Sequence, residues 1–135
     1  MIFVRILFVC TGNTCRSPMA AAIMLELDPD AQTRSRGLAV FSAQPASLEA
    51  RAVMEERGLD ISAHMSAPVT PEDIEWADAV YGLTEAHAQA LASRFPQHVQ
   101  KIRALPGGGV GDPFGGSADV YRVCARAIEE ALKEL

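Results

Sequence analysis

The sequence has few cysteines, and their number and spacing exclude a secreted scaffold built on disulfides. Three occur, Cys10, Cys15 and Cys124, whereas such scaffolds carry dense and usually even-numbered sets of cysteines. We therefore expect three reduced thiols, and a reduced thiol in a suitable place can carry chemistry.

Long apolar runs are also missing. The longest one, near the N-terminus, is interrupted by Arg5 and ends at Cys10, far short of the ~20 residues that a membrane-spanning helix needs. A basic start, an apolar stretch and a small-residue cleavage site do not follow one another as they do in a secretory signal. These absences predict a cytoplasmic protein that has no membrane partner.

Basic residues do not outnumber acidic ones. Twelve Lys and Arg against seventeen Asp and Glu give a net charge of −5, so no overall field draws the chain onto nucleic acid or anionic lipid. Any anion that the protein binds must therefore be held by a local arrangement of donors.

Apolar runs and turn residues predict strands that alternate with helices. Residues 2–10 are almost continuously apolar, as in a strand that is buried on both faces of a parallel sheet. Further strands are expected at 33–41, 79–83 and 101–105, and helices at 17–27, 47–57, from Thr70-Pro71 onward, and 84–94. The 135 residues thus predict one α/β domain over 1–135, a four-stranded parallel doubly wound sheet with helices on both faces.

A last helix should bury one apolar face at the C-terminus. Its apolar residues repeat at helical spacing, and they are Val120, Val123, Cys124, Ala127, Ile128, Ala131, Leu132 and Leu135. This pattern places Cys124 in the core.

A short polar loop, CTGNTCRSP, begins at Cys10 where the first strand ends and leads straight into a helix. Ligands of doubly wound sheets bind beyond the carboxyl ends of the strands, where the winding direction switches. Gly12 is expected to let successive backbone N–H groups turn inward, the helix N-terminus adds positive potential, and Arg16 offers a planar fork of donors. Cys10 would then be deprotonated at neutral pH and act as a nucleophile, with Ser17 donating a hydrogen bond to its sulfur.

A thiolate that attacks phosphorus needs an acid for the leaving group and then a base for the hydrolytic water. Asp112 precedes Pro113 in a glycine-rich loop that follows the fourth strand, at the same edge of the sheet as Cys10. It could be only a turn former, but together with the Cys10 loop it becomes the candidate acid and base.

These two loops resemble those of the low-molecular-weight protein-tyrosine phosphatase family, whose signature is C-x5-R-[ST] at the N-terminus and an Asp-Pro loop near the C-terminus. The resemblance covers essentially the whole chain and implies a single phosphatase domain that needs no metal or other cofactor. It implies that Cys10 is the nucleophile, Arg16 the phosphate-binding arginine, and Asp112 the general acid and then base. We expect a monomer that acts on a phosphorylated protein and holds phosphate or another oxyanion in the loop.

The resemblance also suggests supporting residues. The phosphate loop would comprise Thr11, Gly12, Asn13, Thr14, Cys15, Arg16 and Ser17, and the hydrogen-bond network behind it Asn13, Ser17, Ser35 and His64. The other histidines, His87 and His98, are expected to be solvated. Cys15 either packs in the loop or forms a reversible disulfide that protects Cys10 from overoxidation.

Two positions favour the protein-arginine phosphatase branch of that family. Thr14 stands where the tyrosine phosphatases usually carry Ile or Leu, and Phe114-Gly115 stands where they carry an aromatic pair. A threonine hydroxyl can accept a hydrogen bond from a phosphoguanidinium group, whereas an aliphatic side chain packs against a phenyl ring. Thr14 and Phe114 are therefore the predicted specificity residues, and phosphoarginine is the favoured substrate.

Three alternatives remain. One is a tyrosine phosphatase with the same mechanism, and another is an inactive phosphate-binding module. The third is a thiol-dependent arsenate reductase, which in the related family passes its disulfide to a further pair of cysteines. The segment from Asp78 to Gly111 contains no such pair, and this disfavours the reductase.

Overall fold

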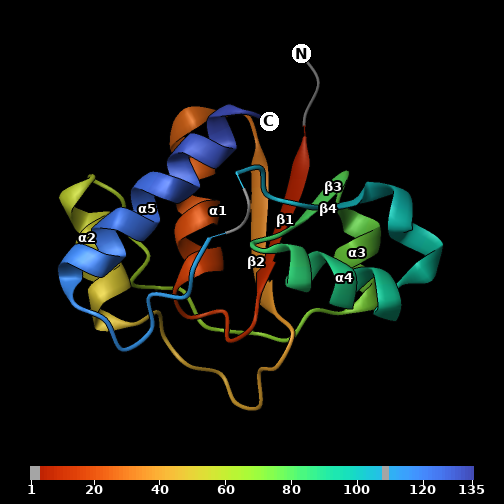
Figure 1. The fold of residues 1–135 in the computed structure, drawn as a ribbon, viewed down its shortest axis with the longest axis horizontal. Helices are drawn as coiled ribbons and strands as arrows, with labels where there is room; N and C mark the ends of the chain where they lie inside the picture. Colours follow the sequence, from red (N-terminus) through yellow and green to blue (C-terminus); the bar gives the residue numbers. More distant parts are fainter. Residues whose placement is uncertain (1–3, 108–109) are drawn as a thin grey trace.

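The computed structural model describes residues 4–107 and 110–135, and its centre is a four-stranded parallel sheet (Figure 1). In spatial order the strands are β2 (Gln32–Gly37), β1 (Arg5–Cys10), β3 (Ala79–Gly82) and β4 (Ile102–Ala104). All three neighbouring pairs run parallel. The predicted sheet is therefore confirmed.

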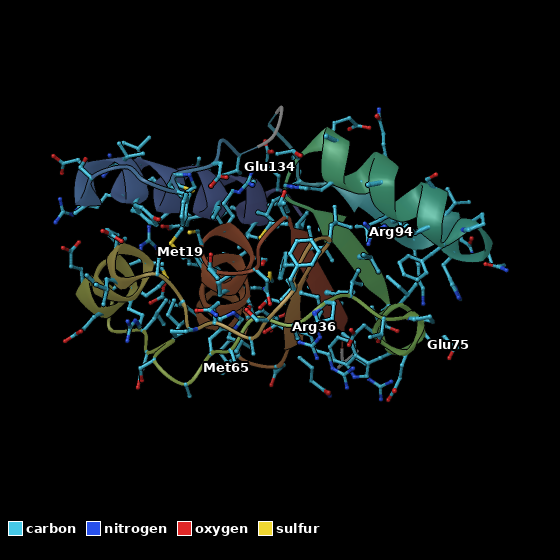
Figure 2. The ribbon with its side chains drawn as sticks, turned by 90° about the horizontal axis from the view of Figure 1, so that it is seen from below. Met19, Arg36, Met65, Glu75, Arg94 and Glu134 are labelled. Carbon is cyan, nitrogen blue, oxygen red and sulfur yellow. The ribbon has the colours of Figure 1, made fainter. Side chains whose placement is uncertain are left out.

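Helices cover both faces of this sheet. One face carries α1 (Arg16–Leu27), α2 (Leu48–Glu56) and α5 (Ala118–Lys133), and the other carries α3 (Pro71–Trp76) and α4 (Glu85–Arg94). A 3-10 helix, η1 (Pro96–Lys101), follows α4. The side view from below shows α1, α2 and α5 together on one side of the strands and α4 on the other (Figure 2). Within the described residues, no helix is long and apolar enough to cross a membrane.

β1 contributes to both cores, which explains its unbroken apolar sequence. Ile6 and Phe8 pack under α1 and α5, whereas Leu7 and Val9 pack under α3 and α4. Because successive side chains of a strand point to opposite faces, a strand with helices on both sides must be apolar at every position.

The topology places β1 at the point where the winding direction switches. From β1 the chain runs to β2 on one side, and it later returns to β3 on the other side. Cys10 pairs with Gly37, and Val9 pairs with Gly82. The segments that follow β1, β2 and β3 therefore leave the sheet at one edge, the lower edge in Figure 1, which is where such folds bind ligands.

The predicted helix starts have side-chain caps. Ser47, Thr70 and Thr84 each accept a hydrogen bond from a backbone N–H of the first turn that follows. Thr70 and Asp73 form a reciprocal capping box. α2 ends just before Gly58, which has a φ of +75°, the left-handed conformation expected after a helix.

One strand boundary differs from the prediction. β2 ends at Gly37 rather than at residue 41, because the chain turns away there to support the loop after β1. The backbone N–H of Leu38 donates to the carbonyl of Cys10 at 2.9 Å, and that of Ala39 donates to the carbonyl of Thr11 at 3.0 Å. The predicted first-strand residues 2 and 3, and residues 108 and 109 of the glycine-rich stretch, lie outside the described residues.

The buried face of α5 also differs from the predicted one. Val120 and Val123 are 46% and 57% exposed, whereas Tyr121 and Ala125 are buried. The rest of the buried face consists of Cys124, Ile128, Ala131 and Leu132, while Ala127 and Leu135 are exposed. Tyr121 determines this orientation, because its ring fills the core and its hydroxyl lies 3.2 Å from Cys15 Sγ.

Candidate active site

A pocket of about 210 Å³ opens at the edge of the sheet where β1 ends. Its lining consists of residues 10–16, together with Asp112 and Phe114 from the segment that precedes α5. The fold thus brings together the two segments that the sequence singled out, although about a hundred residues separate them.

The Cys10 thiol lies at the base of this loop and is buried. The backbone N–H of Asn13 donates to Cys10 Sγ at 3.3 Å, and Ser17 Oγ lies 3.0 Å from the same sulfur. Ser17 Oγ accepts a hydrogen bond from Asn13 Nδ2 at 2.7 Å and lies 3.4 Å from the carbonyl oxygen of Arg36, to which it also donates. The sulfur is thus surrounded by a backbone N–H and a hydroxyl group.

The left-handed residue of the loop is Asn13, with a φ of +58°. The expectation that Gly12 would supply this unusual conformation is wrong, since Gly12 is not among the positive-φ residues. Asparagine tolerates the left-handed region better than most residues do. Its side chain is also held on two sides, because Nδ2 donates to Ser35 Oγ at 3.1 Å and Oδ1 accepts from the backbone N–H of Ala67 at 3.0 Å.

The four residues of the predicted network are in contact. Asn13 bonds to Ser17 and Ser35 through its side chain, and His64 Nε2 donates to the carbonyl of Asn13 at 2.7 Å. Burial lowers the pKa of His64, so the neutral imidazole that makes this bond is favoured. The contacts fix the buried side of the loop from β2 and from the segment before α3.

Two glycines that the sequence reasoning did not single out permit the close approach of neighbouring segments. A β-carbon on Gly37 would lie 2.7 Å from the carbonyl oxygen of Thr11 and 2.5 Å from Val40 Cγ2. One on Gly82 would lie 2.5 Å from the backbone nitrogen of Ala88 in α4. Glycine at the end of a strand is a sequence signal of such an approach.

Arg16 and Asp112 face each other across the pocket. Arg16 is 6% exposed, and its Nη1 donates to the carbonyl of Val110 at 2.9 Å. Its Nη2 lies 3.7 Å from Asp112 Oδ2. Asp112 is more open, with a side chain that is 58% exposed, and its Oδ1 accepts from the backbone N–H of Phe114 at 3.0 Å. A guanidinium thus lines the wall, and a carboxylate lies at the mouth.

His87 is not solvated, so that prediction is wrong. It is 6% exposed, its Nε2 lies 3.0 Å from Thr11 Oγ1, and its Nδ1 lies 3.0 Å from Thr84 Oγ1. Burial, followed by the nearby positive charge of Arg16, lowers the pKa of His87 to about 4. The missed signal was its position three residues after a helix-capping threonine, directly beyond β3. His98 is half-buried in η1.

The other two cysteines have different surroundings. Cys15 Sγ lies 3.2 Å from the hydroxyl of Tyr121 and donates to Ser47 Oγ at 3.6 Å. Burial, together with the contact to Cys15, raises the pKa of Tyr121 to about 12. Cys124 is in the core as predicted, and burial raises the pKa of its thiol to about 12. All three thiols are unpaired, and the redox role of Cys15 stays a prediction.

The two predicted specificity residues border the same pocket. Thr14 is half-buried in the loop, and Phe114 is 73% exposed at the rim. In the part of the chain that the structure describes, His, Cys, Asp and Glu side chains form no group of three that could hold a metal ion. The lining suits an oxyanion, since it contains the guanidinium of Arg16 and the loop that leads into the N-terminus of α1.

Comparison with known proteins gives a consistent result. The model of a family described as low molecular weight phosphotyrosine protein phosphatase matches residues 5–135. A protein-arginine-phosphatase of Geobacillus stearothermophilus is 38% identical, over 97% of this chain and 93% of its own length. A probable low molecular weight protein-tyrosine-phosphatase, EpsP of Ralstonia nicotianae, is 37% identical, over 95% of this chain and 86% of its own length.

The fold comparison agrees. The crystal structure of a low molecular weight protein tyrosine phosphatase from T. tengcongensis superposes with a TM-score of 0.92 at 35% identity. The superposition covers 97% of this chain and 96% of that one. The four-stranded parallel sheet with flanking helices is therefore a fold that the two proteins share.

Proposed function

The chain belongs to the low molecular weight phosphotyrosine protein phosphatase family, and we propose that within it the protein hydrolyses phosphoarginine in preference to phosphotyrosine. Membership makes it a protein phosphatase that acts on a phosphorylated protein. The observation that carries the proposal is one pocket that holds the Cys10 thiol, the Arg16 guanidinium and the Asp112 carboxylate, with the hydroxyl residue Thr14 in its wall.

The proposed reaction has two displacements. In the first, the Cys10 thiolate attacks phosphorus, the bond from phosphorus to the arginine nitrogen breaks, and Asp112 gives its proton to that nitrogen. In the second, Asp112 removes a proton from water as the water oxygen attacks the phosphocysteine, the S–P bond breaks, and the thiolate and inorganic phosphate are released. With phosphotyrosine the leaving atom would be the phenolic oxygen.

Anion binding in this proposal comes from residues 11–17. The loop leads into the N-terminus of α1, which begins at Arg16, so backbone N–H groups and the helix dipole favour negative charge there. Arg16 adds a planar pair of donors that matches two phosphoryl oxygens. Asn13, Ser17, Ser35 and His64 would keep the loop in this shape, and Ser17 would stabilise the sulfur as it leaves.

The preference for phosphoarginine rests on Thr14 and Phe114. A phosphoguanidinium group carries several N–H donors beside its leaving nitrogen, whereas the ring of phosphotyrosine carries none. A hydroxyl in the pocket wall gives one of these donors an acceptor, and Phe114 at the rim offers a flat face to the planar cation. Phosphotyrosine is the second candidate, because relatives named for either activity have similar identities to this chain.

We also propose that residues 1–135 act as a single phosphatase domain and as a monomer. The family match extends over residues 5–135, and the pocket is lined by residues of one chain.

The test is the ratio of kcat/KM for a phosphoarginine peptide to that for a matched phosphotyrosine peptide, measured for the wild type and for Thr14→Ile. We expect the wild type to favour phosphoarginine and the substitution to lower the ratio about tenfold, roughly the worth of one hydrogen bond. Cys10→Ser is the control and should have no turnover while it still binds phosphate. A preference for phosphotyrosine in both proteins would overturn the assignment.

A further inference from the structure

Thr11 is a second hydroxyl residue in the pocket lining, and its Oγ1 contacts a buried histidine. Thr11 is exposed, lines the pocket, and lies directly after Cys10. Its Oγ1 is 3.0 Å from Nε2 of His87. An exposed threonine on a loop would normally rotate freely, so the contact with a buried ring fixes the direction in which this hydroxyl points.

The imidazole of His87 is itself fixed. Its Nδ1 lies 3.0 Å from Thr84 Oγ1, and its backbone N–H donates to the same oxygen at 3.2 Å. The imidazole belongs to the first turn of α4, which follows β3, and it contacts Thr11 in the loop that follows β1. Gly82 lets the backbone of α4 approach β3 closely enough to place the ring there. Rotation of the ring would break both side-chain contacts.

The hydrogen-bond donors and acceptors around His87 indicate whether Thr11 can still accept a hydrogen bond from a substrate. Thr11 Oγ1 accepts the hydrogen of Nε2 in one tautomer of the neutral imidazole and donates to Nε2 in the other. In both tautomers the Thr11 oxygen keeps at least one lone pair that His87 does not use, and Thr11 is part of the pocket lining.

We propose that Thr11 is a second specificity residue, whose oxygen accepts an N–H of the phosphoguanidinium group, and that His87 is the positioning residue that orients it. This inference rests on the proposed preference for phosphoarginine. The guanidinium group has more donors than Thr14 alone can accept, and both threonines line one pocket. The neutral state of His87, which is favoured by its lowered pKa, also keeps a competing positive charge away from the cation.

The experiment compares isosteric and conservative variants on the two matched peptides. Thr11→Val removes the hydroxyl and keeps the shape, so the phosphoarginine to phosphotyrosine ratio of kcat/KM should fall about tenfold. Thr11→Ser keeps the hydroxyl and should hold the ratio within about threefold of the wild type. Both variants are also measured on p-nitrophenyl phosphate, which has no guanidinium group, because Thr11 belongs to the anion-binding loop. The loss on the phosphoarginine peptide should exceed any loss on this substrate, and equal losses on the two would overturn the proposed contact with the guanidinium group.

The role of His87 is tested by a double-mutant cycle. His87→Leu should lower the same ratio when Thr11 is present and have no further effect on it in the Thr11→Val background. If the histidine were purely structural, His87→Leu would instead lower kcat/KM for both peptides equally, and the same loss would appear in the Thr11→Val background. His87→Gln, which keeps an N–H donor, should restore part of the ratio and replaces His87→Leu if that variant does not fold.

The failures of the two proposals are distinguishable. If the wild type favours phosphoarginine but Thr11→Val keeps its ratio, the inference about Thr11 is overturned and the proposed function stands. If the wild type favours phosphotyrosine, both are overturned.

Discussion

The carboxyl group of Asp112 lies at the mouth of the pocket, where two contacts orient it without burying it. Arg16 Nη2 is 3.7 Å from one oxygen, and the backbone N–H of Phe114 donates to the other at 3.0 Å. The side chain is still more than half exposed, so it can exchange protons with water between the two displacements. This position suits a group that first gives a proton to a leaving group and then takes one from water.

Asp112→Ala should therefore slow substrates in proportion to the basicity of their leaving groups. We expect kcat/KM for phenyl phosphate to fall about 10²–10³-fold, and for p-nitrophenyl phosphate about ten times less, because nitrophenolate leaves without a proton. The measurement is the slope of log kcat/KM against leaving-group pKa over a series of aryl phosphates. Asp119→Ala, a change at an exposed carboxylate of α5, is the control and should keep the wild-type slope. Equal losses on all members of the series would argue against the acid role.

The sequence placed Cys10, Arg16 and Asp112 at one site because a thiol, a guanidinium and a carboxylate each follow a strand, and the structure brings them to one pocket. Their catalytic roles stay a proposal. Asn13 as the left-handed residue could not be predicted, because its conformation depends on Ser35 and Ala67, which are distant in the chain. His87 was missed for the same reason, since its partner Thr11 lies 76 residues away.

Among the elements, the end of β2 has the most direct effect on the loop that follows β1. Gly37 pairs with Cys10 in the sheet, and its missing side chain leaves room for the carbonyl of Thr11. Beyond Gly37 the chain continues to bind the loop through the backbone of Leu38 and Ala39. The phosphate loop is thus supported by the neighbouring strand as well as by its own hydrogen bonds.

Gly37→Ala should reduce both stability and activity. The added methyl group would lie 2.7 Å from a backbone oxygen that other bonds hold in place, so the loop must shift, at a cost of about 1–3 kcal/mol. Urea unfolding should show that loss, and kcat/KM should fall at least tenfold because the donors around Cys10 move. Gly12→Ala is the stability control, since its methyl group would lie 3.9 Å from its nearest neighbour. A Gly37→Ala variant as stable as Gly12→Ala would contradict this explanation.

The helices show where periodicity stops being informative. Caps at Ser47, Thr70 and Thr84 fixed the starts of three helices, because a cap is a local interaction. The buried face of α5 was predicted only in part: Cys124, Ile128, Ala131 and Leu132 are buried as predicted, whereas Val120 and Val123 are exposed. Apolar residues occur on two adjacent faces of this helix, and the face that contains Tyr121 is the buried one. The hydroxyl of Tyr121 finds polar partners in Cys15 and Ser47, which a helical repeat within α5 alone does not reveal.

At the scale of the whole molecule, the pocket joins the two ends of the chain. Residues 10–16 run from the end of β1 through the loop to the start of α1, whereas Asp112 and Phe114 precede the last helix. α5 then packs against α1, and Cys15 contacts Tyr121 between them. Local opening of either end would therefore disrupt the site, so the stability of the domain and the integrity of the pocket should vary together.

The pH dependence of stability should show this coupling through His87. Burial and the charge of Arg16 lower its pKa from 6.5 to about 4 in the folded protein. As the pH falls below 6.5, the unfolded chain takes up a proton that the folded protein does not, so the free energy of unfolding decreases until about pH 4. The contribution of His87 is fully present above pH 6.5, and its loss is at most about 3 kcal/mol at roughly 1.4 kcal/mol per pKa unit. Burial shifts the pKa of His64 in the same direction.

Urea unfolding of the wild type and of His87→Gln between pH 7.5 and 4.5 measures this contribution. We expect the difference in unfolding free energy between the two proteins to shrink as the pH falls, because only the wild type loses the histidine contribution. His98→Gln removes a histidine of η1, outside the site, and serves as the matched comparison. A constant difference between the wild type and His87→Gln across the range would show that His87 titrates alike in the folded and unfolded chains. Burial and the charge of Arg16 would then not disfavour the charged imidazole in the folded protein, which contradicts the lowered pKa of His87.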